Sequence, residues 1–196
     1  MTSYRFRSSK AAATALAFVA PLLAQRTAPP QPQPDPMPPP IAAPADKPYV
    51  GPVKLTVDLS DNVHRVASVH EEIPVEEGAK ELLLLYPQWI PGNHSPTGPI
   101  SALGGIITSV DGKRVQWVRD QVNVYAFHVP LVIGSKIVGL DFQYLSPIKK
   151  SEGRIEISNE IADLAWNTVL MYPAGYFSRD IQFDTTLKLP QGWKYA

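Results

Sequence analysis

Histidines and paired acidic residues are the side chains of this chain that could carry hydrolytic chemistry. His70, Glu71 and Glu72 begin like the H-E-x-x-H pattern, in which two histidines one helical turn apart hold zinc. The second histidine is missing because position 74 is proline, and the flanking residues alternate as in a strand. His64 would lie about 20 Å from His70 along an extended strand, too far to share one ion. We therefore predict no metal site, and surface or edge positions for both histidines.

Nucleophilic and acid–base catalysis find little support in the sequence. Ser95 follows His94 but lies outside a G-x-S-x-G pattern, and neighbours in a loop rarely form the hydrogen bond between nucleophile and base. The acidic pairs Glu71-Glu72 and Glu76-Glu77 have lysines nearby, so we expect solvated charges there. No phosphate-binding glycine loop or cofactor motif is present. The residues predict no catalytic site and no cofactor in this chain.

The remaining polar and aromatic residues gather in two segments. Residues 87–100 read PQWIPGNHSPTGPI, and this mixture of proline and glycine predicts a stiff, non-helical loop that holds Trp89, Asn93 and His94 in defined directions. Tyr172 begins a second rigid turn, YPAGY, so the two segments could form one edge of a cleft. We assign Trp117 and Trp166 to the core or rim of the domain.

The elements that must position these loops read as β-strands. Apolar Val53, Leu55 and Val57 alternate with polar residues, as in a half-buried strand. Further strand-like runs cover residues 63–73, 81–86, 106–110, 114–118, 122–129, 137–144, 154–157 and 181–189. Asp111-Gly112 is the strongest hairpin signal, and 82–85, apolar on both faces, is expected to be a central strand. Only a weak helical pattern occurs, near 161–170. The sequence predicts an all-β fold, an antiparallel β-sandwich in preference to a closed barrel.

The first 48 residues differ from the remainder of the 196-residue chain. Residues 1–10 carry three basic side chains and no acidic one, and 11–24 are small or apolar, as in a secretory signal. This apolar run is shorter than the ~20 residues that cross a bilayer as a helix. We predict a signal peptide over 1–28, cleaved after Ala24 or Ala28, no stable membrane span, and an exported protein, periplasmic or secreted.

A proline-rich segment follows the predicted signal peptide. Ten of the twenty residues from 29 to 48 are proline, which predicts a disordered linker ahead of a β-sandwich domain at 49–196. The chain contains no cysteine, so the fold has no disulfide. Eighteen basic residues balance eighteen acidic ones without a basic stripe, which argues against nucleic acid as a partner.

An ordered set of motifs resembles a known family. The motifs are YPQWIPGNH at 86–94, PTGPI at 96–100, AFHV at 126–129, LMYPAGY at 170–176 and LKLPQGW at 187–193. Together they resemble the N-terminal domain of the glycyl-aminopeptidase-type zinc metallopeptidases, secreted or periplasmic enzymes with a thermolysin-like catalytic domain and usually a PDZ domain. Family members often carry Ser-Tyr where this chain has Asn93-His94. The resemblance implies that Trp89, Asn93, His94 and Tyr172 face a peptide-binding cleft as candidate substrate-binding residues.

The resemblance also implies a division of labour between domains. The zinc ligands and the PDZ domain of the family follow the β domain, and this sequence contains neither. We therefore expect an accessory domain that is inactive alone, from a truncated gene or a free-standing copy, with a catalytic metallopeptidase domain and a peptide as partners. The alternative is a free-standing exported β-sandwich that binds carbohydrate or an envelope protein. Whether the chain is itself an enzyme is left open.

Overall fold

The computed structural model describes residues 34, 36–90, 92–146 and 156–196. The chain divides into two compact units, Met1–Met37 and Pro38–Ala196, and the second holds every strand of the described residues. The predicted signal peptide and the start of the predicted linker lie outside the described residues. No helix of the described part is long and apolar enough to cross a membrane.

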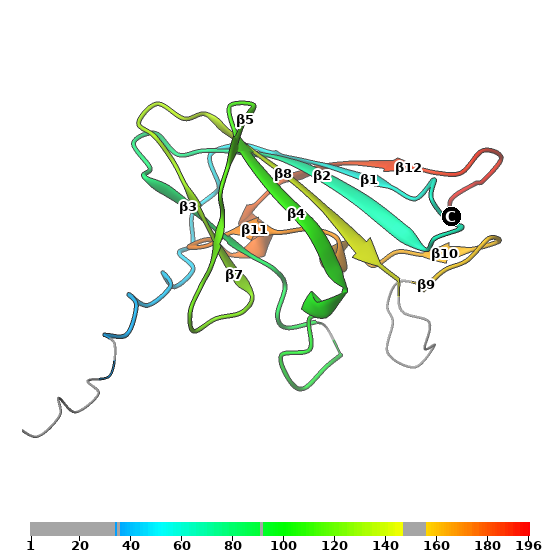
Figure 1. Ribbon diagram of the computed structural model, residues 1–196, viewed down its shortest axis with the longest axis horizontal. Coiled ribbons are helices and arrows are strands. Elements are labelled where there is room, and N and C mark those ends of the chain that lie inside the picture. Colours follow the sequence, from blue (N-terminus) through cyan, green and yellow to red (C-terminus); the bar gives the residue numbers. More distant parts are fainter. Residues whose placement is uncertain (1–33, 35, 91, 147–155) are drawn as a thin grey trace, which may run out of the picture. The chain divides into compact units, whose positions relative to one another are not determined.

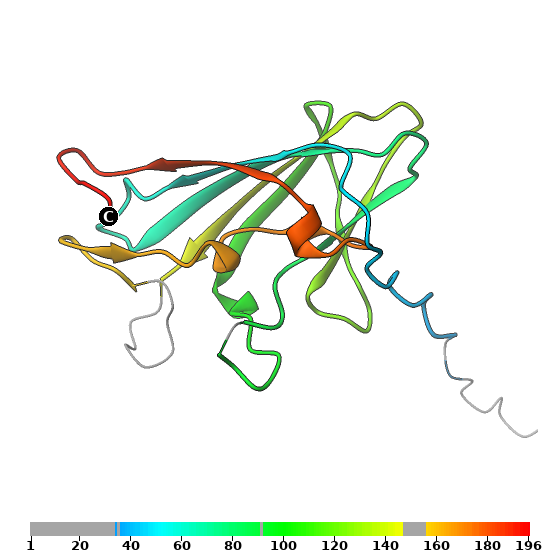
Figure 2. The ribbon, with the colours of Figure 1, turned by 180° about the vertical axis from the view of Figure 1, so that it is seen from behind.

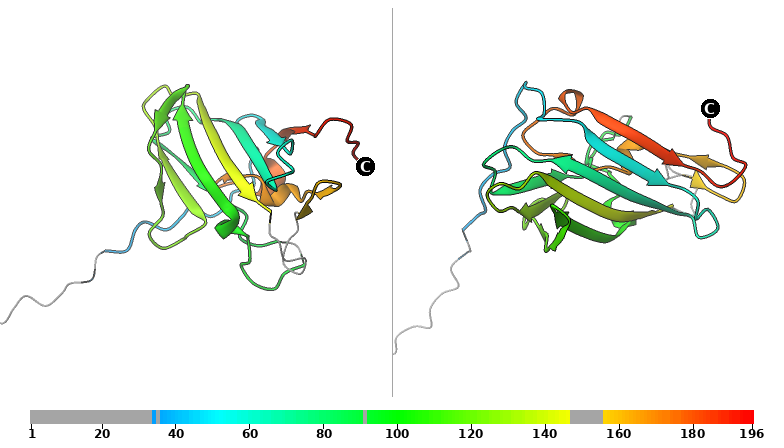
Figure 3. Two further views of the ribbon diagram at one scale, coloured as in Figure 1. Left: turned by 45° about the vertical axis from the view of Figure 1, so that its right-hand side comes forward. Right: turned by 90° about the horizontal axis from the view of Figure 1, so that it is seen from above.

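The larger of the two main sheets has six strands in the order β12-β1-β2-β8-β4-β5, visible side by side in Figure 3 (right). β1 and β12 are parallel, and the other pairs of this sheet are antiparallel. The strands are β1 (Val53–Asp58), β2 (Val66–Pro74), β4 (Leu103–Val110), β5 (Lys113–Val115), β8 (Ile137–Leu145) and β12 (Phe183–Lys188).

The smaller main sheet is antiparallel and has four strands in the order β11-β3-β7-β6 (Figure 1). These are β3 (Glu81–Leu85), β6 (Val118–Arg119), β7 (Ala126–Pro130) and β11 (Tyr172–Pro173). A two-stranded ribbon, β9 (Glu156–Ile157) and β10 (Ala162–Asp163), and three short 3₁₀ helices, η1 (Ile100–Ala102), η2 (Trp166–Thr168) and η3 (Ser178–Asp180), complete the described elements.

One apolar core joins the two main sheets. Its side chains come from alternate positions along the strands, including Leu55 on β1, Val69 on β2, Leu84 on β3, Phe127 on β7 and Leu140 on β8, all at most 3% exposed. Alternation of this kind is what a strand with one buried face requires. The predicted all-β sandwich is confirmed, and β3 is an interior strand of its sheet, as expected for 82–85.

The local predictions differ in outcome. Asp111 and Gly112 connect β4 to β5 with positive φ angles of 48° and 80°, which confirms the hairpin. The stretch with a weak helical pattern near 161–170 forms no α-helix and contains β10 and η2, in keeping with the all-β prediction. The single strand predicted at 114–118 is divided into β5 and β6, which belong to different sheets.

Glu71 is the clearest departure from the sequence-based expectation. Its side chain is fully buried, not solvated, and it lies on β2 in the inward row of Ala67, Val69 and Ile73. Strand periodicity decides this placement, because shifting Glu71 outward would turn the whole apolar row toward solvent. Glu72, the next residue, faces outward and pairs with Lys54 at 2.8 Å.

Candidate functional site

The loop that follows β3 is closed by hydrogen bonds at its base. The Gly98 N–H donates to the Gln88 carbonyl at 3.0 Å, and the Tyr125 hydroxyl lies 3.2 Å and 3.3 Å from the carbonyl oxygens of Pro96 and Gly98. The Ile90 side chain, 4% exposed, anchors the loop to the domain. The described part of the loop is therefore tied at its ends while its middle faces outward.

Gly98 allows the two ends of this loop to approach one another. A Cβ at this position would lie 2.0 Å from the Pro87 carbonyl oxygen and 3.1 Å from Cε1 of Tyr125. The backbone oxygen cannot yield as a flexible side chain would, so only glycine fits this close approach.

A second segment, from η2 to β11, packs beside the loop. The Tyr86 hydroxyl donates to the Thr168 carbonyl at 2.7 Å, and the Met171 N–H donates to Glu71 Oε1 at 2.7 Å. β11 then pairs with β3, with Tyr172 opposite Leu85. The Val169 and Met171 side chains are fully buried, which turns the alternate residues of this segment outward.

The loop and the segment form one groove, which we call the aromatic groove, with a volume of about 530 Å³. Aromatic rings and two other apolar side chains line much of it: Pro87, Trp89, Trp166, Leu170, Tyr172 and Phe183. The polar groups in its lining are the amides of Gln88 and Asn167 and the hydroxyls of Ser178 and Tyr172. None of the described lining residues carries a charge, so the groove suits an uncharged, partly apolar surface.

The structure brings together two of the four candidate residues. Trp89 and Tyr172 line the aromatic groove, and Trp89 is 63% exposed. Asn93 and His94 are exposed on the same loop but do not line the groove. The Asn93 side chain donates to the Thr97 hydroxyl within the loop, which gives it a part in the loop's shape.

Sequence reasoning missed Trp166 as a groove residue. It assigned Trp117 and Trp166 alike to the core or rim, and Trp117 does pack there, with its N–H donating to the Ile106 carbonyl and its ring 5.3 Å from that of Phe127. Trp166 is at the rim but turned outward, 37% exposed, beside Trp89 in the groove. The motif LMYPAGY at 170–176 could have indicated this position, because Trp166 precedes its rigid turn by only a few residues.

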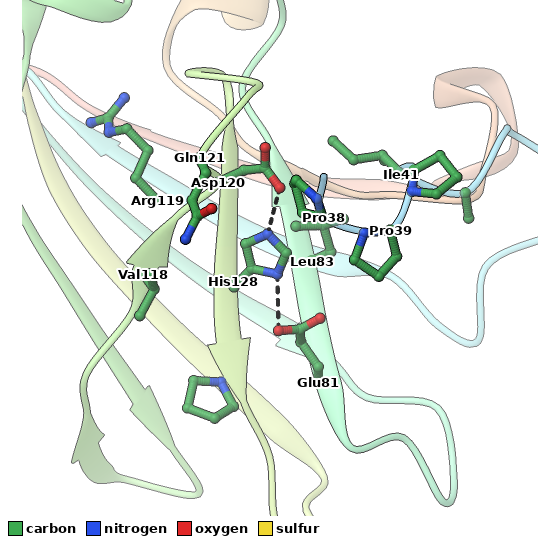
Figure 4. A pocket seen from close by; sticks show the side chains of 13 residues that line it. Pro38, Pro39, Ile41, Glu81, Leu83, Val118, Arg119, Asp120, Gln121 and His128 are labelled. Carbon is green, nitrogen blue, oxygen red and sulfur yellow. Dashed lines mark hydrogen bonds and ion pairs between the residues drawn. The ribbon is translucent and has the colours of Figure 1, made fainter. Parts of the chain in front are cut away.

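A separate cavity of about 520 Å³ lies against the smaller sheet (Figure 4). His128 on β7 lies at its centre, with Nδ1 2.9 Å from Glu81 Oε1 and Nε2 3.0 Å from Asp120 Oδ2. Residues 38–42, which belong to the described part of the proline-rich segment, line the cavity on one side. Because both ring nitrogens are engaged, this histidine links β3, β7 and the turn after β6 and offers no nitrogen for catalysis.

The charges around His128 favour its protonated form. Burial alone would lower the pKa of His128, but hydrogen bonds and the negative charges of Asp120 and Glu81 outweigh it and raise the pKa. Backbone N–H groups of Asn123 and Val122, together with His128, lower the pKa of Asp120 to about 2. Asp120 therefore stays ionised, and an imidazolium can donate to both carboxylates.

The donor groups of the described residues do not fit zinc. His64 and His70 are exposed, as predicted, and their Nδ1 atoms lie 2.6 Å from Asp61 and 2.7 Å from Asp141. In the part of the chain that the structure describes, no group of three or more His, Asp or Glu side chains is placed to hold a metal ion.

The fold and the groove define a two-sheet β domain with an uncharged aromatic surface. The family model that matches the chain is the Peptidase M61 N-terminal domain, over residues 54–196, and the chain belongs to this family. The sequence-based resemblance is thereby confirmed.

Among solved structures, the chain is similar to an aminopeptidase N family protein from Idiomarina loihiensis, with a TM-score of 0.60 and 14% sequence identity. The similarity covers 71% of this chain and 22% of that protein, so the chain spans about a fifth of its neighbour's length. At this identity the likeness shows the fold. No curated protein matches the chain.

The close approach at Gly98 predicts the effect of one added methyl group. Gly98→Ala should lower the free energy of unfolding by about 1–3 kcal/mol, because the Cβ would overlap a backbone oxygen. Urea unfolding followed by tryptophan fluorescence measures this change. Gly104→Ala is the matched control, because it has open space around its Cβ position and a φ angle outside the left-handed region. Equal stability of both variants would contradict the geometry.

The His128 cluster predicts a pH-dependent contribution to stability. Since the pKa of His128 is raised by folding, its stabilising effect is complete below the unfolded pKa of about 6.5 and is lost as pH rises through the folded pKa. The difference in free energy of unfolding between the wild type and His128→Gln should therefore be larger near pH 5.5 than near pH 8.5. Urea titrations at both pH values measure it.

The control for this experiment is His70→Gln, which removes an exposed histidine with a single carboxylate partner, Asp141. Exposed pairs of this kind contribute little to stability, so its effect should change little with pH. A His128→Gln effect that is the same at both pH values would show that the two carboxylates do not hold the imidazolium.

Proposed function

We propose that this domain is the accessory module of an exported aminopeptidase-like metallopeptidase and walls the peptide-binding cleft beside a zinc-containing catalytic domain. The observation that carries the proposal is the aromatic groove, which combines exposed rings, two amides and no charge. Membership of the Peptidase M61 N-terminal domain family supports the pairing with a peptidase. The domain itself supplies no catalytic group in this proposal.

The chemistry of the groove fits a zwitterionic or uncharged peptide. Apolar side chains of a peptide can pack on Trp89, Trp166 and Phe183, while the amides of Gln88 and Asn167 can pair with its backbone. An amide offers both a donor and an acceptor, so it matches a peptide group in either orientation. Asn93 and His94, on the exposed part of the same loop, are proposed to meet the peptide or the catalytic domain outside the groove.

The proposal includes export, since the predicted signal peptide would deliver the domain to the periplasm or medium. The proposed catalytic partner would be exported as well, and the zinc ion is expected in that partner. Recovery of the chain from the cytoplasm with Met1 in place would contradict the export part of the proposal.

A second function is favoured by the same rings. Aromatic side chains beside amides also suit a sugar, whose apolar face packs on a ring while its hydroxyl groups pair with amides. A free-standing module that binds carbohydrate would use Trp89 and Trp166 in this way. A module for an envelope protein would instead need a larger surface than the groove provides.

Titration of the purified chain separates these functions. The zwitterionic tripeptide Gly-Leu-Ala should change the tryptophan fluorescence saturably near neutral pH, whereas cellotriose and chitotriose should not. Trp89→Ala should weaken peptide binding about tenfold or more, as expected for an exposed aromatic anchor.

Trp193→Phe is the control, because Trp193 does not line the groove. It should alter the fluorescence but leave the affinity for the peptide unchanged. Saturable binding of either sugar without peptide binding would favour the carbohydrate module, and peptide binding that survives Trp89→Ala would remove the groove from the proposal.

A further inference from the structure

Glu71 is an acidic side chain at the centre of the sandwich. Its residue is 0% exposed, Oε1 accepts the Met171 N–H at 2.7 Å, and Oε2 is buried without a hydrogen-bond partner among the described residues. A buried polar atom without a partner is costly, and an unpaired buried charge is more costly still. Such a group requires an explanation beyond packing.

The surroundings of Glu71 contain no compensating charge. Its cross-strand neighbours are Leu55 on β1 and Leu140 on β8. Burial raises the pKa of Glu71 to about 8, and the hydrogen bond from Met171 lowers it by less. The charged side chains of the two flanking strands, Lys54 and Asp58 on β1 and Asp141 on β8, alternate with the buried rows and face away from Glu71. On the core side the neighbouring segments carry the phenols of Tyr86, Tyr144 and Tyr172, and burial raises the pKa of all three above the usual value. These tyrosines stay neutral where Glu71 titrates.

The hydrogen bond from Met171 connects this acid to the aromatic groove. Met171 lies between Leu170 and Tyr172, which both line the groove, and η2 just before them carries Trp166. We propose that Glu71 is a positioning residue that holds this wall of the groove as a neutral acid, and that its ionisation releases the wall. The proposal rests on the proposed function only for the identity of the peptide ligand. The movement of the groove wall can be tested without a ligand.

The wall is the part of the structure that can respond. β2 is paired with β8 along its whole length and with β1 over residues 68–72, so the strand that carries Glu71 cannot move outward without breaking two ladders. The wall has no comparable ladder: β11 has two residues paired with β3, Thr168 accepts one hydrogen bond from Tyr86, and Met171 donates to Glu71. The buried side chains of Val169 and Met171 complete its attachment to the core. Opening the wall admits water to an ionised Glu71 at the lowest cost.

Two measurements test the proposal on the full chain. In ¹³C NMR of glutamate-labelled protein, the carboxyl carbon assigned to Glu71 should titrate near pH 8, while that of Glu72 titrates at acidic pH. Amide hydrogen exchange should show that protection of the Met171 N–H, corrected for intrinsic exchange, falls by up to about tenfold per pH unit between the usual glutamate pKa of about 4.3 and the raised pKa of Glu71, and levels off above it. An amide of β8 should keep its protection over the same range.

Variants separate ionisation from a merely structural role. Glu71→Gln retains an acceptor for Met171 but cannot ionise, so protection of the Met171 N–H should change less than about twofold between pH 6 and pH 9.5. Glu72→Gln, which alters the adjacent outward-facing residue, should behave like the wild type.

The outcomes that overturn the proposal are equally direct. One is a Glu71 carboxyl that titrates at acidic pH, and another is protection in the wild type that does not depend on pH. Equal loss of protection in the wild type and Glu71→Gln is a third. If Glu71→Gln does not fold, the first two outcomes remain decisive in the wild type. Binding of Gly-Leu-Ala is measured separately, so a failure of the ligand proposal leaves this test intact.

Discussion

The larger sheet must bury an apolar face that the smaller sheet covers only in part. Strands β2 and β8 each have nine residues, whereas β3 and β7 have five and β11 has two. The segment from η2 to β11 supplies additional cover beneath the large sheet, as Figure 2 shows, and contributes the fully buried Val169 and Met171. This packing requirement places an irregular segment at the core and turns its aromatic residues to the surface.

The same requirement explains why polar contacts appear at the core. An irregular segment cannot satisfy its backbone groups through a ladder, so partners must come from side chains. Tyr86 and Glu71 provide them, at Thr168 and Met171. The Tyr86 hydroxyl pairs with a backbone carbonyl in the core without burying a charge. A carboxyl group in the same role can be buried at low free-energy cost only when it is neutral. The groove wall therefore depends on a side chain whose protonation can change within an ordinary range of pH.

The fold was accessible from the sequence to the extent that local patterns determine it. Alternation in β1, the Asp111-Gly112 turn and the apolar run of β3 each predicted the element observed. The parallel pairing of β1 with β12 was not predictable, because it joins residues far apart in the chain and leaves no local pattern. Glu71 was misjudged because residue type was given more weight than its position in the period-two row.

The candidate site was accessible in part for the same reason. Composition identified the stiff loop with Trp89 and the turn at Tyr172, and their shared groove depends on the tertiary packing of two segments. Trp166 lines the same groove because η2, which comes after the ribbon β9–β10 in the chain, packs beside the loop. Residue type alone could not separate it from Trp117, since both have apolar neighbours. The proposal of ligand recognition rests on this arrangement of aromatic and amide side chains.

The claim that this domain recognises a ligand and performs no chemistry is tested most directly by metal content and turnover together. Purified protein incubated with zinc and then desalted should retain no stoichiometric zinc, and it should not release the N-terminal residue of Gly-Leu-Ala. Stoichiometric, tightly held zinc together with aminopeptidase turnover would contradict the account.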